Sequence, residues 1–282
     1  MNFKTPLLAL ALGLLAATTQ AEVRYEHIRN ASAKVQYGGS TFLIDPYLAP
    51  KGSYAGFAGT VNSEKRNPLV NMSQPINKVI EGVDAVVVTH THPDHWDEAA
   101  QKALPKSLPV FVQNAGDAAT IRGQGFTDVR VVGKNTEFNG VKLSKTGGQH
   151  GTDTMYSIPK LAEFLGDAMG VVFEKPQEKT LYIVGDTVWN HHVDNALATY
   201  QPQIVVMNTG DARLTDFKGG IIMGVNDVAK MAKTAPNAQI ITVHMDAVNH
   251  ATVSSRDMRD FVNKQALKQV AVPNSGDVLE FK

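Results

Sequence analysis

The chain has 282 residues, 43% of them hydrophobic, enough to bury a substantial core in one large domain or two small ones. Its 27 basic and 27 acidic residues balance, so no charge excess points to nucleic acid or an anionic membrane surface as a partner. The absence of cysteine excludes disulfides and a cysteine-linked lipid anchor, and it leaves His, Asp and Glu to hold any metal ion.

Residues 1–21 are typical of a secretory signal peptide. Lys4 supplies a positive charge, residues 6–17 form an apolar run, and small residues precede a cleavage point before Glu22. The run of 12 residues is short of the ~20 that a membrane-spanning helix needs, so cleavage is favoured over an anchor. We therefore expect one mature domain, residues 22–282, in the periplasm or outside a bacterial cell.

The mature chain opens with strand-like segments and a long loop. Residues 22–29 alternate polar and apolar side chains, and residues 33–37 and 41–44 flank a Gly-Gly pair, which predicts a hairpin. Residues 50–71 are rich in Gly, Ser, Asn and Lys. Because core-type segments lie on both sides, this stretch predicts a long loop near the entrance of a site.

Short apolar strands then alternate with helical segments, beginning with a buried strand at residues 85–88. We expect further strands at residues 110–113, 129–132, 141–146, 170–174, 180–184, 204–208, 240–244, 270–272 and 278–281, and helices at residues 97–104, 116–123, 225–234 and 254–264. Strands outnumber helices and no break in composition divides the chain. We therefore predict a single α/β domain with two sheets between helical layers.

The strongest chemical signal is a cluster of metal-binding side chains directly after the strand at residues 85–88. His90, His92, Asp94 and His95 place three imidazoles and a carboxylate within six residues, a donor set that suits zinc and other divalent ions. On a turn, the first two side chains point to one side and the last two to the other, which leaves room for two ions. The alternative is a solvated, His-rich loop, which this spacing at a strand end disfavours.

The run His-x-His-x-Asp-His resembles the signature of the metallo-β-lactamase superfamily, and the likeness extends over residues 22–282. That resemblance implies a four-layer αββα sandwich. It also implies a later histidine, an aspartate and a last histidine, each at a strand end; His150, Asp186 and His244 stand there in that order. Residues 43–46 (LIDP) resemble the branch that includes L-ascorbate-6-phosphate lactonase.

The resemblance implies two metal ions that share one carboxylate. The first ion takes His90, His92 and His150, the second takes Asp94, His95 and His244, and Asp186 bridges both. Zinc is the expected ion, with Mn²⁺, Fe²⁺ or Ni²⁺ as alternatives for the same ligand types. Taken singly, Asp186 fits a polar turn, and His150 and His244 fit structural histidines; their order along the chain favours the metal.

Two residues near the end of the chain, His250 and Asp246, leave alternatives open. His250 competes with His244 for the last ligand position, and the strand end favours His244. His250 and Asp246 then either support the ligands, face the substrate, or belong to a surface loop. His27, on an early strand, is assigned no role.

Four other polar residues have two interpretations each. Asp45 either orients a metal ligand or caps a turn, and Arg213 either binds an anionic substrate group or makes a surface salt bridge. We expect His191 and His192 in a loop beyond the bridging aspartate, either as a solvated pair or with one ring near the site.

The implied chemistry is hydrolysis by a metal-activated water, with Asp94 as the catalytic residue that holds this water and passes a proton to the leaving group. The missing cysteine and the bridging Asp186 disfavour β-lactam hydrolysis. We expect an ester or lactone substrate. A phosphodiester is the enzymatic alternative, and a metal-binding or interaction module with the chemistry lost is the non-enzymatic one.

The expected partner is a small-molecule substrate, with neither nucleic acid nor, after signal cleavage, a membrane. The sequence carries no signal for an oligomeric state.

Overall fold

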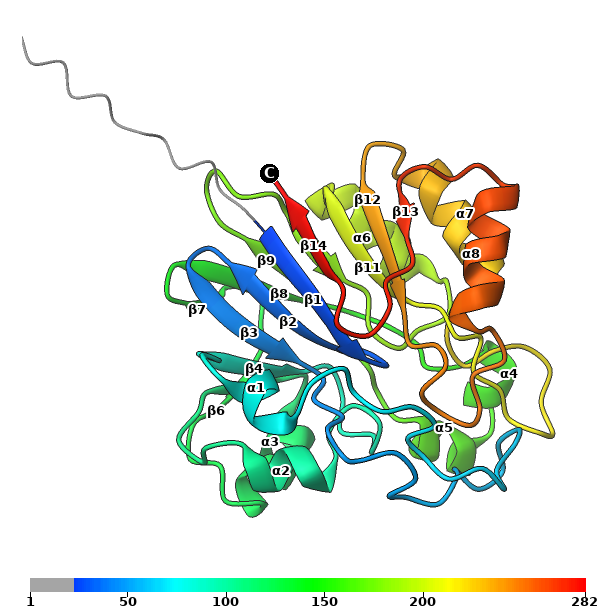
Figure 1. Ribbon diagram of the computed structural model, residues 1–282, viewed down its shortest axis with the longest axis horizontal. Helices are drawn as coiled ribbons and strands as arrows, with labels where there is room; N and C mark the ends of the chain where they lie inside the picture. The colour runs from blue at the N-terminus through cyan, green and yellow to red at the C-terminus, as the bar shows by residue number, and fades with distance from the viewer. Residues whose placement is uncertain (1–22) are drawn as a thin grey trace, which may run out of the picture.

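Two seven-stranded sheets pack face to face in this protein, as a computed structural model that describes residues 23–282 shows (Figure 1). The expected signal peptide, residues 1–21, lies outside the described residues. In the described part of the chain, no helix combines the length and the apolar character that a bilayer crossing requires.

The first sheet combines an antiparallel half with a parallel half. Its order is β14 (Val278–Phe281), β1 (Val23–Arg29), β2 (Ser32–Tyr37), β3 (Ser40–Ile44), β4 (Ala85–Val88), β5 (Val110–Val112) and β6 (Val129–Val131). Pairing is antiparallel from β14 to β3 and parallel from β3 to β6. Gly38 and Gly39 both have positive φ, which confirms the predicted tight hairpin between β2 and β3.

The second sheet has the same mixed character. Its order is β13 (Val270–Ala271), β12 (Gln239–Val243), β11 (Ile204–Asn208), β10 (Leu181–Ile183), β9 (Gly170–Glu174), β8 (Val141–Thr146) and β7 (Thr136–Phe138). Strands β10 to β13 are parallel, and β7 to β10 are antiparallel. The parallel strands therefore bring several strand ends to one edge, where the sequence places its polar residues.

Helices cover the outer face of each sheet. Helices α1 (Ile76–Ile80), α2 (Glu98–Ala103) and α3 (Ala115–Gly123) pack on the first sheet, and α6 (His191–Tyr200), α7 (Val225–Thr234) and α8 (Ser255–Lys264) pack on the second (Figure 1). Two shorter helices, α4 (Asp153–Tyr156) and α5 (Pro159–Leu165), lie in the connection between β8 and β9.

Three hydrophobic cores separate the four layers. In β4, Val87 packs between the sheets while Val86 and Val88 face the helices, as the two-residue period of a strand requires. Phe42 and Phe173, from opposite sheets, meet edge to face in the central core with ring centroids 5.2 Å apart. This arrangement confirms the predicted αββα sandwich.

The structure also contains elements that the sequence did not predict, namely α1, α4, α5, α6 and β7. The expected loop at His191 and His192 is wrong, because both residues open helix α6. The Asn190 side chain accepts a hydrogen bond from the backbone N–H of His192 and caps this helix. Val193, Ala196 and Leu197 then bury one face of it.

Candidate metal centre

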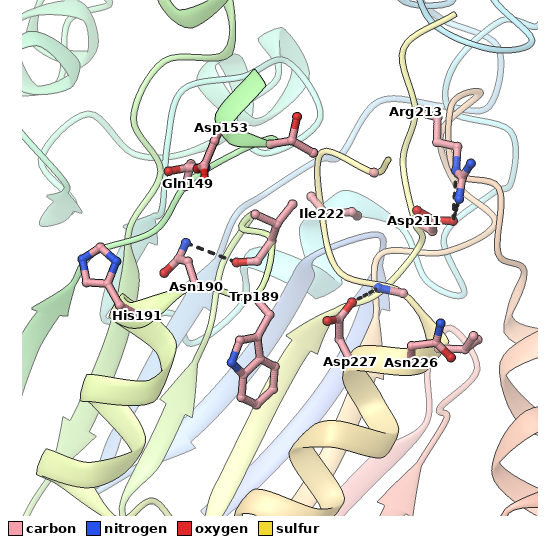
Figure 2. Close-up of a pocket in the computed structure, with 15 residues that line it drawn as sticks. Gln149, Asp153, Trp189, Asn190, His191, Asp211, Arg213, Ile222, Asn226 and Asp227 are labelled. Carbon is pink, nitrogen blue, oxygen red and sulfur yellow. Dashed lines mark hydrogen bonds and ion pairs between the residues drawn. The ribbon is translucent and has the colours of Figure 1, made fainter. Parts of the chain in front are cut away.

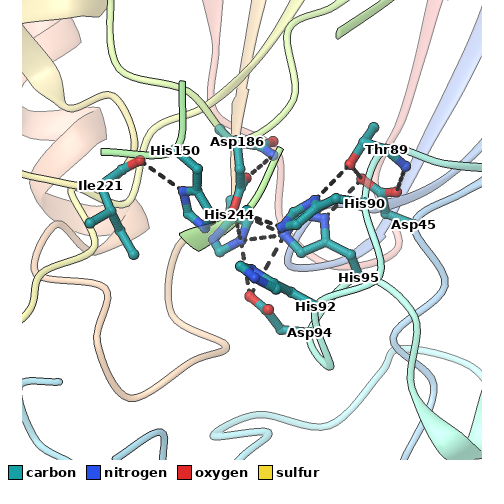
Figure 3. Close-up of polar contacts among 12 residues, drawn as sticks. Asp45, Thr89, His90, His92, Asp94, His95, His150, Asp186, Ile221 and His244 are labelled. Carbon is teal, nitrogen blue, oxygen red and sulfur yellow. Dashed lines mark hydrogen bonds and ion pairs between the residues drawn. The ribbon is translucent and has the colours of Figure 1, made fainter. Parts of the chain in front are cut away.

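The seven side chains predicted as ligands converge where β4, β8, β10 and β12 end (Figure 3). All of them except His92 are buried. His90, His92 and His150 form one group, His90, His95 and Asp186 a second, and Asp94, His95 and His244 a third, with the ligand atoms of each group within 4.8 Å of one another.

Asp186 lies at the centre of the cluster. Its Oδ2 is 3.1 Å from Nε2 of His95 and 3.5 Å from Nε2 of His244. The same oxygen is 3.6 Å from Nε2 of His150 and 4.0 Å from Nε2 of His90. One carboxylate oxygen is therefore shared by four imidazoles, which is the position expected of a bridging ligand.

Asp94 belongs to only one of the three groups, with His95 and His244. Its Oδ2 is 3.2 Å from Nε2 of His244 and 3.7 Å from Nε2 of His95. Asn30 donates from Nδ2 to the carboxylate and the backbone carbonyl of Asp94, at 3.3 and 3.2 Å. The Asp94 carboxylate is thereby fixed against the His95 and His244 rings.

Outer contacts orient two of the imidazoles. Nδ1 of His95 lies 2.9 Å from Oδ2 of Asp45, whose carboxylate also accepts hydrogen bonds from the backbone N–H and hydroxyl of Thr89 at 2.7 and 2.8 Å. Nδ1 of His150 lies 2.9 Å from the Ile221 carbonyl. Such contacts fix the ring so that Nε2 faces the site. Asp45 therefore orients a candidate ligand, the first of its two interpretations.

The donor set fits a divalent cation. Nε2 of His90 is buried and has no hydrogen-bond partner among residues 23–282, although it points toward Asp186. Nε2 of His92 lies 3.3 Å from the Phe164 carbonyl, which leaves Nδ1 as the free nitrogen of that ring. Unpaired imidazole nitrogens and carboxylate oxygens in a buried site are costly, and a cation satisfies both.

The protonation of the rings agrees with this fit. Burial lowers the pKa of His92 to about 4 and that of His90 well below its usual value, so both rings are neutral, the form that binds metal. Burial also opposes charge on His95 and His244, but nearby carboxylates, Asp186 foremost, raise the pKa of both rings. This half of the cluster attracts positive charge, and protons and metal ions compete for it.

A pocket of about 340 Å³ lies directly over the cluster. The metal cluster contributes His92, Asp94 and His150 to its lining. The rest of the lining comes from Phe57, Thr60, Pro93, Phe164, Leu165, Leu214, Ile221 and His250. The loop at residues 50–71 contributes two of these side chains, which agrees with its predicted place near a site entrance.

A second, more polar cleft of about 760 Å³ is lined by Gln149, the residue before His150, and by Trp189, Asn190 and Asp227 among others (Figure 2). Arg213 lines it and pairs with Asp211 at 2.6 Å, so Arg213 is in the salt bridge of its second interpretation and does not line the pocket over the cluster. His191 lines the same cleft, and neither His191 nor His192 belongs to the metal groups among the described residues.

The structure gives different places to His244, His250 and Asp246, which lie close together in the sequence. His244 joins the cluster, and His250 lines the pocket. Burial lowers the pKa of His250 to about 4, so its ring is neutral. Asp246 is not at the centre: its Oδ1 accepts a hydrogen bond from the backbone N–H of Ser255 at 3.0 Å and supports the start of α8.

Sequence reasoning missed two asparagines that hold the carboxylates. Asn208 donates to Oδ1 of Asp186 at 2.6 Å, and Asn30 contacts both Asp94 and Nε2 of His244. Asn208 is the last residue of β11, and its place at a strand end was a usable signal. Asn30 lies in the turn between β1 and β2 with a φ of 57°, and nothing in its sequence context marked it.

The sequence profile described as "Beta-lactamase superfamily domain" matches residues 40–245. The chain belongs to this superfamily. The UPF0173 protein YddR of Bacillus subtilis is 43% identical over 255 residues, which cover 90% of this chain and 98% of the relative. The UPF0173 metal-dependent hydrolase MJ1163 of Methanocaldococcus jannaschii is 27% identical over 247 residues, 86% of this chain and 98% of the relative.

Two solved structures are similar over nearly the whole domain. A possible metal-dependent hydrolase from Veillonella parvula is 49% identical with a TM-score of 0.91, covering 92% of this chain and 99% of that one. An isothiocyanate hydrolase from Delia radicum gut bacteria is 42% identical with a TM-score of 0.88 and the same coverage. The chain is therefore a metal-dependent hydrolase of the UPF0173 family, which sets aside the non-enzymatic alternative.

Proposed function

We propose that this hydrolase adds water to an electrophilic carbon of a small, neutral, apolar substrate, and that an isothiocyanate is the preferred one. The observation that carries the proposal is the lining of the pocket over the cluster. Phe57, Phe164, Leu165, Leu214 and Ile221 make most of it apolar, and none of its lining residues is lysine or arginine.

This lining disfavours the phosphodiester alternative. A phosphodiester is anionic, and proteins hold such groups with arginine or lysine side chains. Arg213 is paired with Asp211 in the neighbouring cleft. A neutral, apolar substrate needs no such partner and gains free energy from burial against the aromatic and aliphatic side chains.

The similarity to an isothiocyanate hydrolase, at 42% identity over 92% of this chain, supports the isothiocyanate as first candidate. An isothiocyanate is neutral, linear and electrophilic at its central carbon. A carboxylic ester or lactone is the second candidate, because its carbonyl carbon is also neutral and electrophilic and fits the same apolar pocket.

The ligand assignment that we propose follows the three groups of side chains. His90, His92 and His150 would hold one ion, Asp94, His95 and His244 would hold a second, and Asp186, which groups with His90 and His95, would be shared by both. Zinc is the expected metal in both positions. When bound, such ions would supply a water of lowered pKa and a Lewis acid that polarises the substrate.

Asp94 holds the attacking water, since its carboxylate lines the pocket and is fixed by Asn30. The water oxygen bonds to the central carbon of R–N=C=S, the C=N π electrons move to nitrogen, and a water proton reaches that nitrogen through Asp94. The product of this addition is the thiocarbamic acid R–NH–C(=S)–OH, which keeps the second water proton on oxygen. Transfer of that proton to nitrogen and cleavage of the C–N bond then release the amine R–NH2 and carbonyl sulfide.

A substrate panel tests the proposal on the zinc-loaded enzyme. We expect kcat/KM for allyl or benzyl isothiocyanate to exceed that for p-nitrophenyl acetate, γ-butyrolactone and bis(p-nitrophenyl) phosphate. Amine release and carbonyl sulfide formation should match in amount. A preference for the phosphate diester would overturn the proposal, and a preference for the ester or lactone would select the second candidate.

A further inference from the structure

One polar side chain of the pocket has no part in the proposed metal sets. We propose that His250 is a further catalytic residue, one that donates an N–H hydrogen bond to the substrate atom on which negative charge develops. This inference rests on the proposed hydrolysis and assigns a role that the metal ligands leave open.

The position of His250 supports a contact with substrate. Its ring lines the same pocket as His92, Asp94 and His150, yet it belongs to none of the metal groups among the described residues. The residue is only 6% exposed, and its Nδ1 is buried without a hydrogen-bond partner among residues 23–282. The protein therefore leaves hydrogen-bonding capacity unused on a ring that lines the pocket.

The ring is held in place by its surroundings. It packs against Phe57 at 5.1 Å between ring centroids, with an interplanar angle of 89°. The backbone carbonyl of His250 accepts a hydrogen bond from the backbone N–H of Arg213 at 3.0 Å. A donor fixed in this way needs no reorganisation when charge appears.

Asn249 secures the backbone one residue earlier. Its backbone N–H donates to Oδ1 of Asn67 at 2.8 Å, and its own Oδ1 accepts from Nδ2 of Asn67 at 2.8 Å and from the backbone N–H of Phe57 at 3.0 Å. The segment that carries His250 and the loop that carries Phe57 are therefore joined by direct hydrogen bonds.

The proposed reaction needs a hydrogen-bond donor at the substrate atom that gains negative charge, and the His250 ring can supply one. As the water oxygen bonds to the central carbon, charge moves to the substrate nitrogen and sulfur. His92, Asp94 and His150 belong to the predicted metal groups, whereas His250 lines the same pocket and belongs to none of the groups found among the described residues. Removing a fixed hydrogen-bond donor of this kind typically lowers kcat by about 10² to 10³-fold.

Matched variants test the role. His250→Phe keeps a flat ring without a donor, and we expect kcat on benzyl isothiocyanate to fall about 100-fold with KM little changed. His250→Gln retains an N–H donor and should recover part of that loss. In His250→Ala, added imidazole should restore turnover, an effect that a purely structural role would not produce. His191→Phe, at the exposed start of α6, is the control and should match the wild type.

Two measurements keep this test independent of the proposed substrate. Metal content and thermal unfolding should be unchanged in His250→Phe; loss of metal would make His250 a metal-holding residue and overturn the proposal. The dissociation constant of thiocyanate, a linear N–C–S probe, should rise about tenfold in that variant. An unchanged constant or unchanged kcat would also overturn it. If the wild type hydrolyses neither isothiocyanates nor esters, the proposed function fails, and thiocyanate binding alone decides the role of His250.

Discussion

Asp186 is the residue on which the centre depends most. Its Oδ2 lies between 3.1 and 4.0 Å from four imidazole nitrogens, and Asn208 fixes its other oxygen. Each imidazole is a neutral donor or a weak cation, so the negative charge that would balance bound metal comes from this carboxylate and from Asp94. We therefore expect the affinity of the site for metal to depend on the charge of Asp186 more than on the shape of its side chain.

Asp186→Asn tests this dependence, because it keeps the shape and removes the charge. We expect bound metal to weaken at least about tenfold and turnover to fall by more than about 100-fold. Metal content after dialysis against a weak chelator and kcat are the measurements. Asp246→Asn is the matched control, since Asp246 contacts Ser255 away from the centre. A fully metal-loaded, active Asp186→Asn would remove the bridging role.

His27 governs a pH response outside the centre. Burial, opposed by Asp277 and Asp246, lowers the pKa of His27 to about 4. The unfolded chain protonates His27 near pH 6.5, so the folded state holds it neutral where the unfolded state binds a proton. His27 therefore does not reduce the free energy of unfolding above pH 6.5. As the pH falls from about 6.5 to 4, protonation of His27 in the unfolded chain lowers that free energy.

His27→Leu should remove this pH dependence. Between about pH 7 and pH 5, we expect the free energy of unfolding of the metal-free wild type to fall by about 2 kcal/mol more than that of the variant. Urea unfolding of both proteins at each pH gives the two slopes. Parallel pH profiles for the two proteins would show that His27 does not carry the effect.

At the scale of elements, the pocket depends on a contact between two irregular segments. The loop at residues 50–71 supplies Phe57 and Thr60, and Asn249, beyond the end of β12, fixes it. Nδ2 of Asn249 donates to Oγ1 of Thr60 and to the carbonyl of Val61, each at 2.8 Å. One buried amide thus adds to the two isolated β-bridges of this loop, Tyr54 with Asn67 and Thr60 with Leu214.

Asn249→Ala should loosen the loop without touching a proposed ligand. The unpaired loop groups should cost about 2–3 kcal/mol of unfolding free energy, and KM should rise more than kcat falls. Urea unfolding, limited proteolysis within residues 50–71 and steady-state kinetics check the three effects. Asn263→Ala, on the exposed side of α8, should change none of them. An Asn249→Ala protein with an intact loop and normal KM would contradict the interpretation.

Elements differed in how well the sequence predicted them. The strands were short runs of β-branched and aromatic residues bounded by turn residues, so most of the strands were predicted correctly. Helix α6 was missed because its start, Asn190-His191-His192, reads as a polar loop. Its cap and its buried face become visible only when the second sheet is present to cover Val193 and Leu197.

At the scale of the whole molecule, we propose export of the protein, with cleavage of residues 1–21. Fractionation of a bacterial host that expresses the full chain should place the protein in the periplasm or medium. Its N-terminal sequence should begin at Glu22. A cytoplasmic protein that retains Lys4 would rule out export, and deletion of residues 2–21 is the control that should keep the protein inside the cell.

The sequence by itself determined the donor set and the layered fold. His90, His92, Asp94 and His95 lie within six residues, so their chemistry is local, and His150, Asp186 and His244 were assigned because the resemblance to the metallo-β-lactamase superfamily implies such residues at strand ends in this order. The same resemblance predicted that these side chains meet, and the structure brings them together where β4, β8, β10 and β12 end.

Only the tertiary structure decided the character of the pocket. Phe57, Phe164, Leu214 and His250 lie far apart in the sequence and meet over the metal cluster. Tertiary packing also separated His250 at the pocket wall from Asp246 at the start of α8. The physical reason is that exposure, hydrogen-bond partners and pKa depend on side chains contributed by distant segments. The metal-binding side chains could be predicted from the sequence, whereas the lining of the pocket that selects a substrate could not.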